Sequence, residues 1–572
     1  MRRSVRAPRL GLLMVPLVGA ALCMVFGTDH LGARTAGGVL VAIGLLAQVA
    51  RLLIALRAGQ VASFWIRLAT AEVLSLSLGA WYYANHPTEV VLIVVSVVLL
   101  GAGVWLGRML PRSVSAIPYT ANLTGAPKIR PEMPRRHYGW YSIVLVGVWT
   151  LGFVAGLVQL PAFVLLALAL VGLALMAMVA VPLLRYAAAH PKTFQALRAL
   201  APAYVMPYNG FATFHIGMWS PYIERAGKPF YVLTTNRETF ERLSTAYTMP
   251  IVCPADSSPG ALAAVLPSSV QAAFYVHNGR NKKFFGHRRM THVFLHHGDG
   301  DKPASSTPGS KRYDALVVAG QAAIDRYARR GVKVPLEKFH ILGRPQTEAI
   351  RTVHHPISAV SDPVILYAPT WCGSDESTNF SSLHLGVPIV QALLDRGGTV
   401  IFRPHPAGRN HEGHARAIRE IKAMLAADHK QTGRSHVWGK QAESTWSVAD
   451  VSNQADAMIA DVSGIVTDFM QTLKPFAMVA TKSDTPSFRE EYPSSQSAYV
   501  IEGDLSTLDG ALEQMLGEDP LAEVRTERRR YYLGGFDADE SARAFVDYVR
   551  SLAPDPPGDH RYRRATSRNP SA

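Results

Sequence analysis

Two adjacent histidines, His296 and His297, have a sequence context that suits acid–base chemistry. They follow the short apolar run 293–295, which predicts a buried strand, and they precede Gly298 and Gly300, which let the backbone turn sharply. Proteins of the α/β class commonly place their chemistry on loops just past the carboxyl ends of strands. An imidazole with an ordinary pKa of about 6.5 can take a proton from a hydroxyl near neutral pH. The alternative is a pair of surface histidines, since the chain has 20.

A second stretch has the residue types of a phosphate site. An apolar run ends at Asp461, Ser463 is a natural helix N-cap, and Gly464 begins a segment predicted to be a helix over residues 464–473. Free N–H groups at such a helix start attract phosphate, the glycine allows a close approach, and the serine hydroxyl can donate a hydrogen bond. An ordinary capped helix is the alternative interpretation.

Two further predicted strand ends carry polar residues. The run 399–402 leads to Arg403 and His405 on a loop stiffened by prolines. An arginine there can bind phosphate with two hydrogen bonds, and the histidine can serve as a second acid or as a hydrogen-bond donor. Another apolar run leads to Thr370 and Trp371, which we expect to line the same cleft, although Trp371 also suits a packing role.

Positive charge suggests anionic partners. The chain has a net charge of +15, and five positive charges in the segment 278–289, among them Arg280, Lys282 and Lys283, flank two phenylalanines. This segment is either a patch that touches anionic lipid headgroups or a phosphorylated acceptor, or a solvated basic loop. We expect no nucleic-acid partner, because no zinc-finger, RNP or helix-turn-helix pattern accompanies the charge. No cluster of His, Cys, Asp and Glu has a convincing metal-ligand spacing, so we expect no metal and no cofactor.

The elements that must position these residues follow an α/β pattern. From about residue 204 to 549 short apolar runs alternate with amphipathic segments, which indicates parallel sheets covered by helices. The linker-like segment 354–363 divides this region, and we predict two Rossmann-like domains, residues 201–355 and 356–552, that face each other across a cleft. We expect the Pro- and Arg-rich tail 553–572 to be disordered. The predicted strands are 230–234, 251–252, 273–276, 293–295, 315–318, 339–342, 364–367, 399–402 and 457–460.

Hydropathy predicts a different structure for residues 1–200. About six transmembrane helices are expected in this α-helical membrane region, at residues 10–26, 37–56, 61–83, 90–106, 143–160 and 162–184. Basic residues cluster before the first segment, between the fourth and the fifth, and after the sixth, so the positive-inside rule places both termini in the cytoplasm. The sequence therefore predicts a multi-pass protein of the cell membrane with a cytoplasmic α/β part. Three widely spaced cysteines suit that reducing compartment.

Taken in order, these residues resemble the CDP-glycerol glycerophosphotransferases, the enzymes that prime and polymerise teichoic acids. The resemblance covers about residues 204–517 and leaves out the apolar N-terminal third. It rests on His297-Gly298, Gly343-Arg344-Pro345, the stretch 366–371 that ends in Pro-Thr-Trp, Arg403-Pro-His-Pro406, Asp461-Val-Ser463-Gly464, Asp468 and Lys474-Pro475.

The resemblance implies a GT-B fold and a reaction. The acceptor domain comes first and the nucleotide domain second, His297 is the base for the acceptor hydroxyl, and His405 and Ser463 lie near the donor diphosphate. The hydroxyl attacks the β-phosphate of a CDP-activated polyol, CMP leaves, and helix N-termini with Arg or His neutralise the developing charge without a metal. Together with the residue patterns, it gives a donor or phosphate set of Arg403, Ser463, Gly464, Thr370, Asp461 and Asp468, and an acceptor or loop set of Gly298, Asp299, Arg280, Lys282 and Lys283.

Three motifs depart from the family pattern. Asp299 stands where the family usually has Thr or Ser, Val462 and Gly464 interrupt its Asp-Tyr-Ser-Ser, and Cys372 replaces an arginine. The sequence predicts a membrane-anchored transferase that moves glycerol phosphate or a related polyol phosphate to a lipid-linked envelope polymer or glycan, with membrane lipids as further partners. The alternatives are CDP-ribitol as the donor, a GT-B glycosyltransferase that uses a nucleotide sugar, and a non-catalytic nucleotide-sensing membrane protein.

Overall fold

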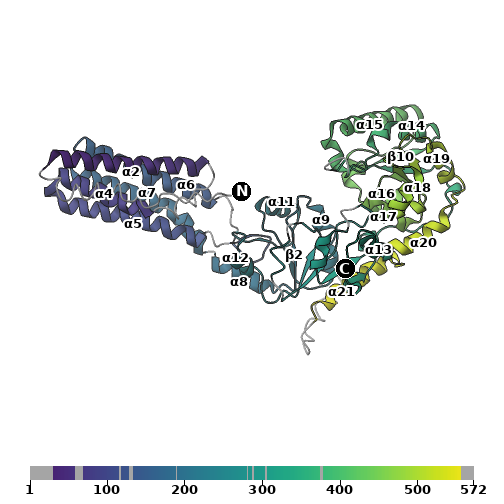
Figure 1. Ribbon diagram of the computed structural model, residues 1–572, viewed down its shortest axis with the longest axis horizontal. Coiled ribbons are helices and arrows are strands. Elements are labelled where there is room, and N and C mark those ends of the chain that lie inside the picture. Colours follow the sequence, from purple (N-terminus) through teal and green to yellow (C-terminus); the bar gives the residue numbers. More distant parts are fainter. Residues whose placement is uncertain are drawn as a thin grey trace, which may run out of the picture. The chain divides into compact units, whose positions relative to one another are not determined.

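The computed structural model describes residues 30–57, 69–114, 118–127, 133–188, 190–279, 281–286, 289–302, 306–373 and 378–554. The chain folds into two compact units, one formed by residues 1–200 with 247–267 and the other by 201–246 with 268–572 (Figure 1). The predicted disordered tail lies almost entirely outside the described residues.

The first unit is a bundle of long helices. Leu78, Trp81, Val104 and Trp149 are among the residues buried where these helices pack on one another, and the indole of Trp149 donates to Ser75 Oγ at 3.1 Å. A short strand, β1 (Tyr119–Ala121), pairs antiparallel with β4 (Ile251–Cys253). The helices of this unit are α2 (Leu31–Arg57), α4 (Ala69–Asn85), α5 (Val90–Val114), α6 (Met133–Leu157), α7 (Ala162–Ala188), α8 (His190–Leu200) and α12 (Pro259–Ala264).

The prediction of about six transmembrane helices is wrong. Among the described residues one helical stretch, Pro87–Trp105, is long and apolar enough to cross a membrane, while Leu31–Ala47, Ser142–Leu157 and Ala162–Met178 are shorter apolar stretches. The first predicted span, 10–26, lies outside the described residues, and the third does so in part. Hydropathy overstated the number of spans because it scores an apolar side chain alike whether the residue faces outward or packs against a neighbouring helix.

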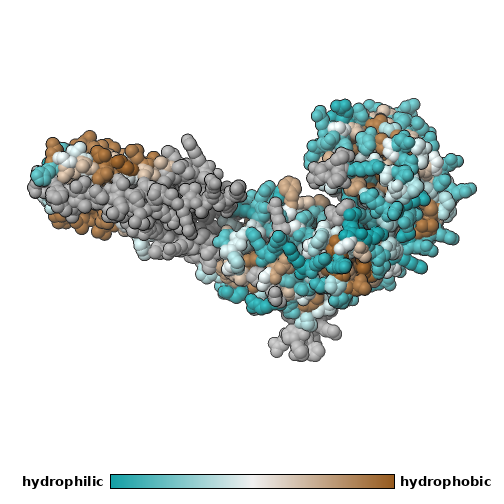
Figure 2. Space-filling view, in the orientation of Figure 1, coloured by the Kyte–Doolittle hydropathy of each residue, from teal (hydrophilic) through white to brown (hydrophobic). Residues whose placement is uncertain are grey.

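The outer faces of the bundle are nevertheless apolar. Figure 2 shows hydrophobic side chains gathered over it, and Val91, Val98 and Met178 are each more than 60% exposed. Only 28% of the stretch Pro87–Trp105 is buried. Apolar surface of this extent marks an interaction face.

The second unit begins with a parallel sheet. Its strands run in the order β3-β2-β5-β6-β7-β8 and are β2 (Tyr204–Pro207), β3 (Phe230–Leu233), β5 (Ala272–Tyr275), β6 (Thr291–Phe294), β7 (Ala315–Val318) and β8 (Phe339–Ile341). Its helices are α9 (Phe214–Gly217), α10 (Ser220–Arg225), α11 (Arg237–Ala246) and α13 (Gln321–Arg329). Every residue of β2, β3, β5 and β7 is buried, as expected for a parallel sheet covered on both faces, whereas the edge strand β8 is only partly buried.

A second parallel sheet follows the segment 354–363. Its order is β10-β9-β11-β12-β13, with β9 (Val364–Ala368), β10 (Thr399–Phe402), β11 (Ala457–Ala460), β12 (Phe476–Ala480) and β13 (Tyr499–Glu502). Its helices are α14 (Gly386–Asp395), α15 (Glu412–Thr432), α16 (Val448–Gln454), α17 (Gly464–Phe469), α18 (Thr485–Glu491) and α19 (Leu508–Leu516). These two sheets confirm the predicted pair of Rossmann-like halves of GT-B type.

The last two helices return to the first half. Helix α20 (Ala522–Leu533) lies against α13, and α21 (Ala538–Ser551) lies against α10. Tyr204 on β2 donates to the carbonyl of Val549 at 3.0 Å, and Ser541 donates to the carbonyl of Leu342 at 2.9 Å. The second unit therefore consists of two halves that the C-terminal helices tie together.

Candidate functional site

His297 lies just past the carboxyl end of β6, with its side chain exposed to solvent. Its Nδ1 is 3.1 Å from the carbonyl oxygen of Val276. A carbonyl can only accept, so Nδ1 carries the proton and Nε2 keeps a free electron pair. Burial of part of the ring, together with the nearby His277, lowers the pKa of His297. The ring is therefore neutral near pH 7 and has the form that can take a proton.

Two histidines that the sequence analysis did not single out lie beside His297. The His215 ring centroid is 4.4 Å away and the His277 centroid 5.6 Å away. His215 belongs to the short helix α9, which comes after β2, and His277 follows β5. Because β2, β5 and β6 are neighbours in a parallel sheet, their carboxyl ends meet at one edge and bring the three rings together. A sequence signal was available for His277, which directly follows an apolar run, but not for His215, which lies farther past its strand.

Ser463 and Gly464 lie at the facing edge of the second half, after β11. Ser463 occupies the predicted N-cap position, but its side chain makes no capping hydrogen bond. Its Oγ is buried and has no hydrogen-bond partner within the described part of the chain. A Cβ placed on Gly464 would meet none of the described atoms within 4 Å. An unpartnered hydroxyl beside open backbone is an arrangement that a ligand oxygen can complete.

A lysine that was also not singled out reaches this edge from the first half. Lys302 Nζ donates to Thr370 Oγ1 at 3.2 Å and lies 5.4 Å from the centre of the Phe380 ring. Burial lowers the pKa of Lys302, and the negative charge of Asp461 partly opposes that shift. Its sequence signal was weak, because Lys302 is one of 58 basic residues.

His405 lies on the same edge in the opposite tautomer to His297. Its Nδ1 accepts a hydrogen bond from the Ala407 N–H at 3.2 Å, so the neutral ring carries its proton on Nε2 and can donate. Burial, and then the positive charge of Lys302, lower the pKa of His405. The Trp371 ring lies 6.2 Å away at an angle of 24°.

Asp461 organises the loop that carries Thr370. The carboxylate is fully buried and accepts hydrogen bonds from the backbone N–H of Thr370 at 2.7 Å and of Ser382 at 3.1 Å. Burial raises its pKa to about 6. Its contacts hold the backbone at Thr370 and Ser382 in place.

Other predicted site residues have partners inside the protein. Arg403 donates to the carbonyls of Ala442 and of Trp446, the latter at 2.8 Å. Asp299 is ion-paired with Arg326, and Asp468 with Arg344. Lys282 and Lys283 are exposed, whereas Arg280 lies outside the described residues.

The segment from Gly298 to Lys302 joins the two edges. A Cβ on Gly300 would lie 3.4 Å from the Ser463 carbonyl oxygen, an ordinary van der Waals distance, so the two backbone segments lie side by side. The Asp299 carbonyl accepts a hydrogen bond from Thr467, and the Asp301 carboxylate accepts one from the Ser494 N–H at 2.9 Å. Gly300, three residues after His297, therefore lies beside the turn that carries Ser463.

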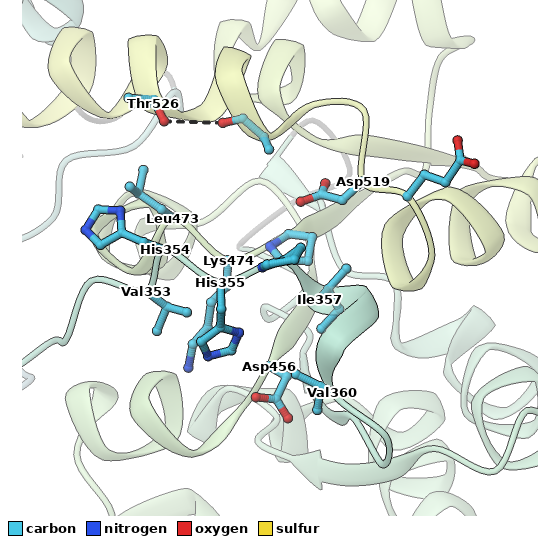
Figure 3. Close-up of a pocket in the computed structure, with 14 residues that line it drawn as sticks. Val353, His354, His355, Ile357, Val360, Asp456, Leu473, Lys474, Asp519 and Thr526 are labelled. Atoms are coloured by element: carbon cyan, nitrogen blue, oxygen red, sulfur yellow. Dashed lines mark hydrogen bonds between the residues drawn. The ribbon is translucent and has the colours of Figure 1, made fainter.

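A cavity of about 230 Å³ lies elsewhere, at the amino ends of β11 and β12 (Figure 3). His354 and His355 from the linker contribute to its lining. Lys474 donates there to the carbonyls of Ser452, Asn453 and Ala455. These bonds give a structural role to the lysine of Lys474-Pro475, one of the motifs that carry the family resemblance. Its position at the amino ends separates this cavity from the residues at the carboxyl ends.

Comparisons with known proteins give a family match over part of the chain. Residues 270–495 match the model of the family described as CDP-glycerol:poly(glycerophosphate) glycerophosphotransferase. No curated protein matches the sequence significantly.

Among solved structures, the wall teichoic acid polymerase TagF is similar with a TM-score of 0.37 and 13% identity, over 64% of this chain and 94% of that chain. The putatively assigned UDP-N-acetylglucosamine 2-epimerase from Listeria monocytogenes has a TM-score of 0.40 and 13% identity, over 61% of this chain and 97% of that chain. These two likenesses are distant. The family match begins just before β5, ends between α18 and β13, and includes His297, Lys302, Thr370, His405 and Ser463. Residues 270–495 are thus similar to the CDP-glycerol:poly(glycerophosphate) glycerophosphotransferase family, and the chain is a glycerophosphotransferase-like enzyme.

Proposed function

We propose that this enzyme transfers glycerol phosphate, or a related polyol phosphate, from a CDP-activated donor to a hydroxyl of a lipid-linked cell-envelope polymer. The observation that carries the proposal is the pair of complementary tautomers at the two edges. His297 presents an electron pair on the first half, whereas His405 presents an N–H on the second. Attack of a hydroxyl on a diphosphate needs a proton acceptor for the hydroxyl and hydrogen-bond donors for the phosphate oxygens. His297 suits the first role, and His405 with Lys302 suits the second.

The chemistry assigns one role to each side. His297 Nε2 takes the proton of the acceptor hydroxyl while the hydroxyl oxygen forms a bond to the β-phosphorus of the donor. The bond between that phosphorus and the oxygen bridging to the α-phosphate breaks, and CMP leaves with the electron pair. Lys302, His405 and Ser463 stabilise the phosphate oxygens, because charge-assisted hydrogen bonds at a partly dry site are strong.

The proposal includes attachment to a membrane, with the α/β part on the cytosolic side. Its support is the exposed apolar surface of the helical bundle and the stretch Pro87–Trp105. A lipid-linked acceptor would then be held near the site. The exposed Lys282, Lys283 and Arg289 suit the anionic groups of such an acceptor or of the surrounding lipids.

The test is the identity of the nucleotide that the full-length protein releases. The protein, in membranes that contain lipid-linked acceptor, is incubated with CDP-glycerol, CDP-ribitol and a panel of UDP-sugars. The proposal predicts CMP from a CDP-polyol together with label in the lipid-linked fraction. Release of UDP would establish a glycosyltransferase instead. Donor binding without any product would establish a nucleotide-sensing protein, and either outcome would contradict the proposal.

A further inference from the structure

We propose that His277 and His215 are positioning residues for His297, which hold the base in its neutral, correctly oriented form. This inference rests on the proposed role of His297 and adds two residues to it. Both rings come from strand-end segments of the same sheet edge, so the arrangement is built by the fold of the first half alone.

The geometry of the rings supports this role. His277 stacks on His297 with an interplanar angle of 28°, and His215 lies on His297 at 38° with centroids only 4.4 Å apart. The His215 and His277 rings are themselves 6.3 Å apart at 18°. An imidazole confined by two others has little freedom to rotate, so Nε2 of His297 keeps one direction.

Hydrogen bonds assign a tautomer to each neighbour. The Gly279 N–H donates to Nδ1 of His277 at 2.9 Å, which places the proton of the neutral His277 ring on Nε2. The Tyr208 hydroxyl donates to the Ala212 carbonyl at 2.5 Å, so its oxygen accepts from Nδ1 of His215 at 3.2 Å. The His277 ring is therefore held by the backbone of its own segment, and the His215 ring is held through Tyr208, which is bonded to the backbone at Ala212.

The charges around the cluster favour neutral rings. Burial, then His297 and His277, lower the pKa of His215 to about 3. For His297 the largest cause after burial is His277, and Arg344 lowers its pKa as well, while the Val276 carbonyl opposes the shift. A proton on any of these rings would repel a proton on another. Within the described residues no group of three or more His, Cys, Asp or Glu is arranged to hold a metal ion.

The test is the pH dependence of His297 in full-length protein with His277→Asn. Asparagine keeps an acceptor for the Gly279 N–H but cannot be protonated. The reactivity of His297 with diethylpyrocarbonate, followed by mass spectrometry of the peptide that contains His297, reports the neutral fraction of this histidine without any substrate. We expect the pH midpoint of His297 reactivity to be higher than in the wild type by about half a pH unit or more, because His277, a neighbour that can carry the same charge, has been removed. The buried His296 in the same peptide is the internal control.

A second variant keeps all three imidazoles. A Cβ on Gly279 would lie 2.7 Å from Cε1 of His277, so Gly279→Ala must displace that ring. Gly286→Ala is the matched control, because Gly286 is exposed and a Cβ there would meet none of the described atoms within 4 Å. We expect Gly279→Ala, but not Gly286→Ala, to move the His297 midpoint and the acidic limb of kcat/KM in the same direction as His277→Asn.

The outcomes separate this inference from the proposed function. Unchanged midpoints in both His277→Asn and Gly279→Ala would overturn the positioning role even if the wild type makes product. If the two variants shift the His297 midpoint but the wild-type protein releases no CMP from any donor, the role of the histidine cluster is supported and the proposed reaction is overturned.

Discussion

At the scale of single residues, the adjacent histidines His296 and His297 have different surroundings, because His296 is buried and His297 is exposed. His296 has a φ of +60°, which is unfavourable for a residue with a Cβ. Its ring is 2.9 Å from the Tyr327 hydroxyl and 3.1 Å from the Val317 carbonyl, and its own carbonyl accepts from Trp219 at 2.8 Å. These contacts fix the turn that places His297 just past the carboxyl end of β6.

The buried His296 predicts a loss of stability in acid. Burial lowers its pKa to about 4, whereas the unfolded chain has an ordinary value of about 6.5. Because the unfolded state binds the proton more readily, the stabilisation is complete above pH 6.5 and is lost as the pH falls toward 4. We expect the melting temperature to fall over that range, and to fall less steeply in His296→Gln. Equal slopes in a pH series of thermal melts would contradict this assignment.

Lys302 predicts a donor-binding defect without a folding defect. Lys302→Met keeps the length of the side chain but removes the charge that lies beside Thr370. We expect affinity for a CDP-polyol to fall by about 10- to 100-fold, the value of a charge-assisted hydrogen bond, with unchanged or higher stability because a buried cation is costly. Titration calorimetry measures the affinity. Lys338→Met, which removes a lysine that donates to the Tyr313 carbonyl, is the control, and an equal loss in both variants would contradict the assignment.

At the scale of elements, the turn from β11 into α17 carries Ser463 and Gly464, the residues proposed to bind phosphate. Its serine has the position of a cap without the hydrogen bond of one, whereas Thr467, one turn later, donates to the Asp299 carbonyl. The two hydroxyls of one element therefore have different tasks.

Paired variants separate these tasks. Ser463→Ala should weaken donor binding by about 5- to 10-fold, one hydrogen bond, and leave the melting temperature unchanged. Thr467→Val should lower the melting temperature, because it leaves a buried carbonyl unpaired, and should affect binding less. Calorimetric melts and donor titrations of both proteins provide the comparison. The reverse pattern would show that Ser463 is structural.

The elements also show what the sequence could predict. Runs such as 315–318 and 399–402 coincide with β7 and β10, because a strand buried on both faces is a continuous apolar run. Strands β1, β2, β12 and β13 were not predicted. The predicted helix 464–473 ends at Phe469 and continues as a 3-10 turn. Periodicity does not determine where tertiary contacts end a helix.

The site was predictable where its residues directly follow a strand. His297, Ser463 and His405 each do so, and sequence spacing alone places them at sheet edges. His215 lies well beyond β2, and its contact with His297 depends on the strand order β2-β5-β6, which no local pattern encodes. The buried partners of Asp299 and Asp468 were likewise invisible, because Arg326 and Arg344 reach them only in the folded protein.

At the scale of the whole molecule, the two halves of the α/β unit are joined by a buried ion pair. Arg344, after β8, makes two hydrogen bonds to the Asp468 carboxylate on α17, one of them at 3.2 Å. Both side chains are at most 11% exposed. This pair gives a structural reason for two of the marks on which the family resemblance rests.

Breaking this pair should destabilise the protein strongly. Arg344→Met leaves a buried carboxylate without its partner, and we expect a loss of about 3–5 kcal/mol in the free energy of unfolding. Arg344→Met combined with Asp468→Leu should recover much of that loss. Arg396→Met, which removes an exposed pairing with Asp509, should cost at most about 1 kcal/mol. Denaturant titrations decide, and an equal effect of the two single arginine variants would contradict the account.

The central claim is that His297 is the base that takes the proton of the acceptor hydroxyl. The direct measurement is single-turnover formation of CMP from CDP-glycerol with lipid-linked acceptor, in the wild type, His297→Ala and the linker control His354→Ala. We expect His297→Ala to lose at least about 100-fold in rate with donor affinity nearly intact, and His354→Ala to match the wild type. Turnover by His297→Ala at the wild-type rate would contradict the claim.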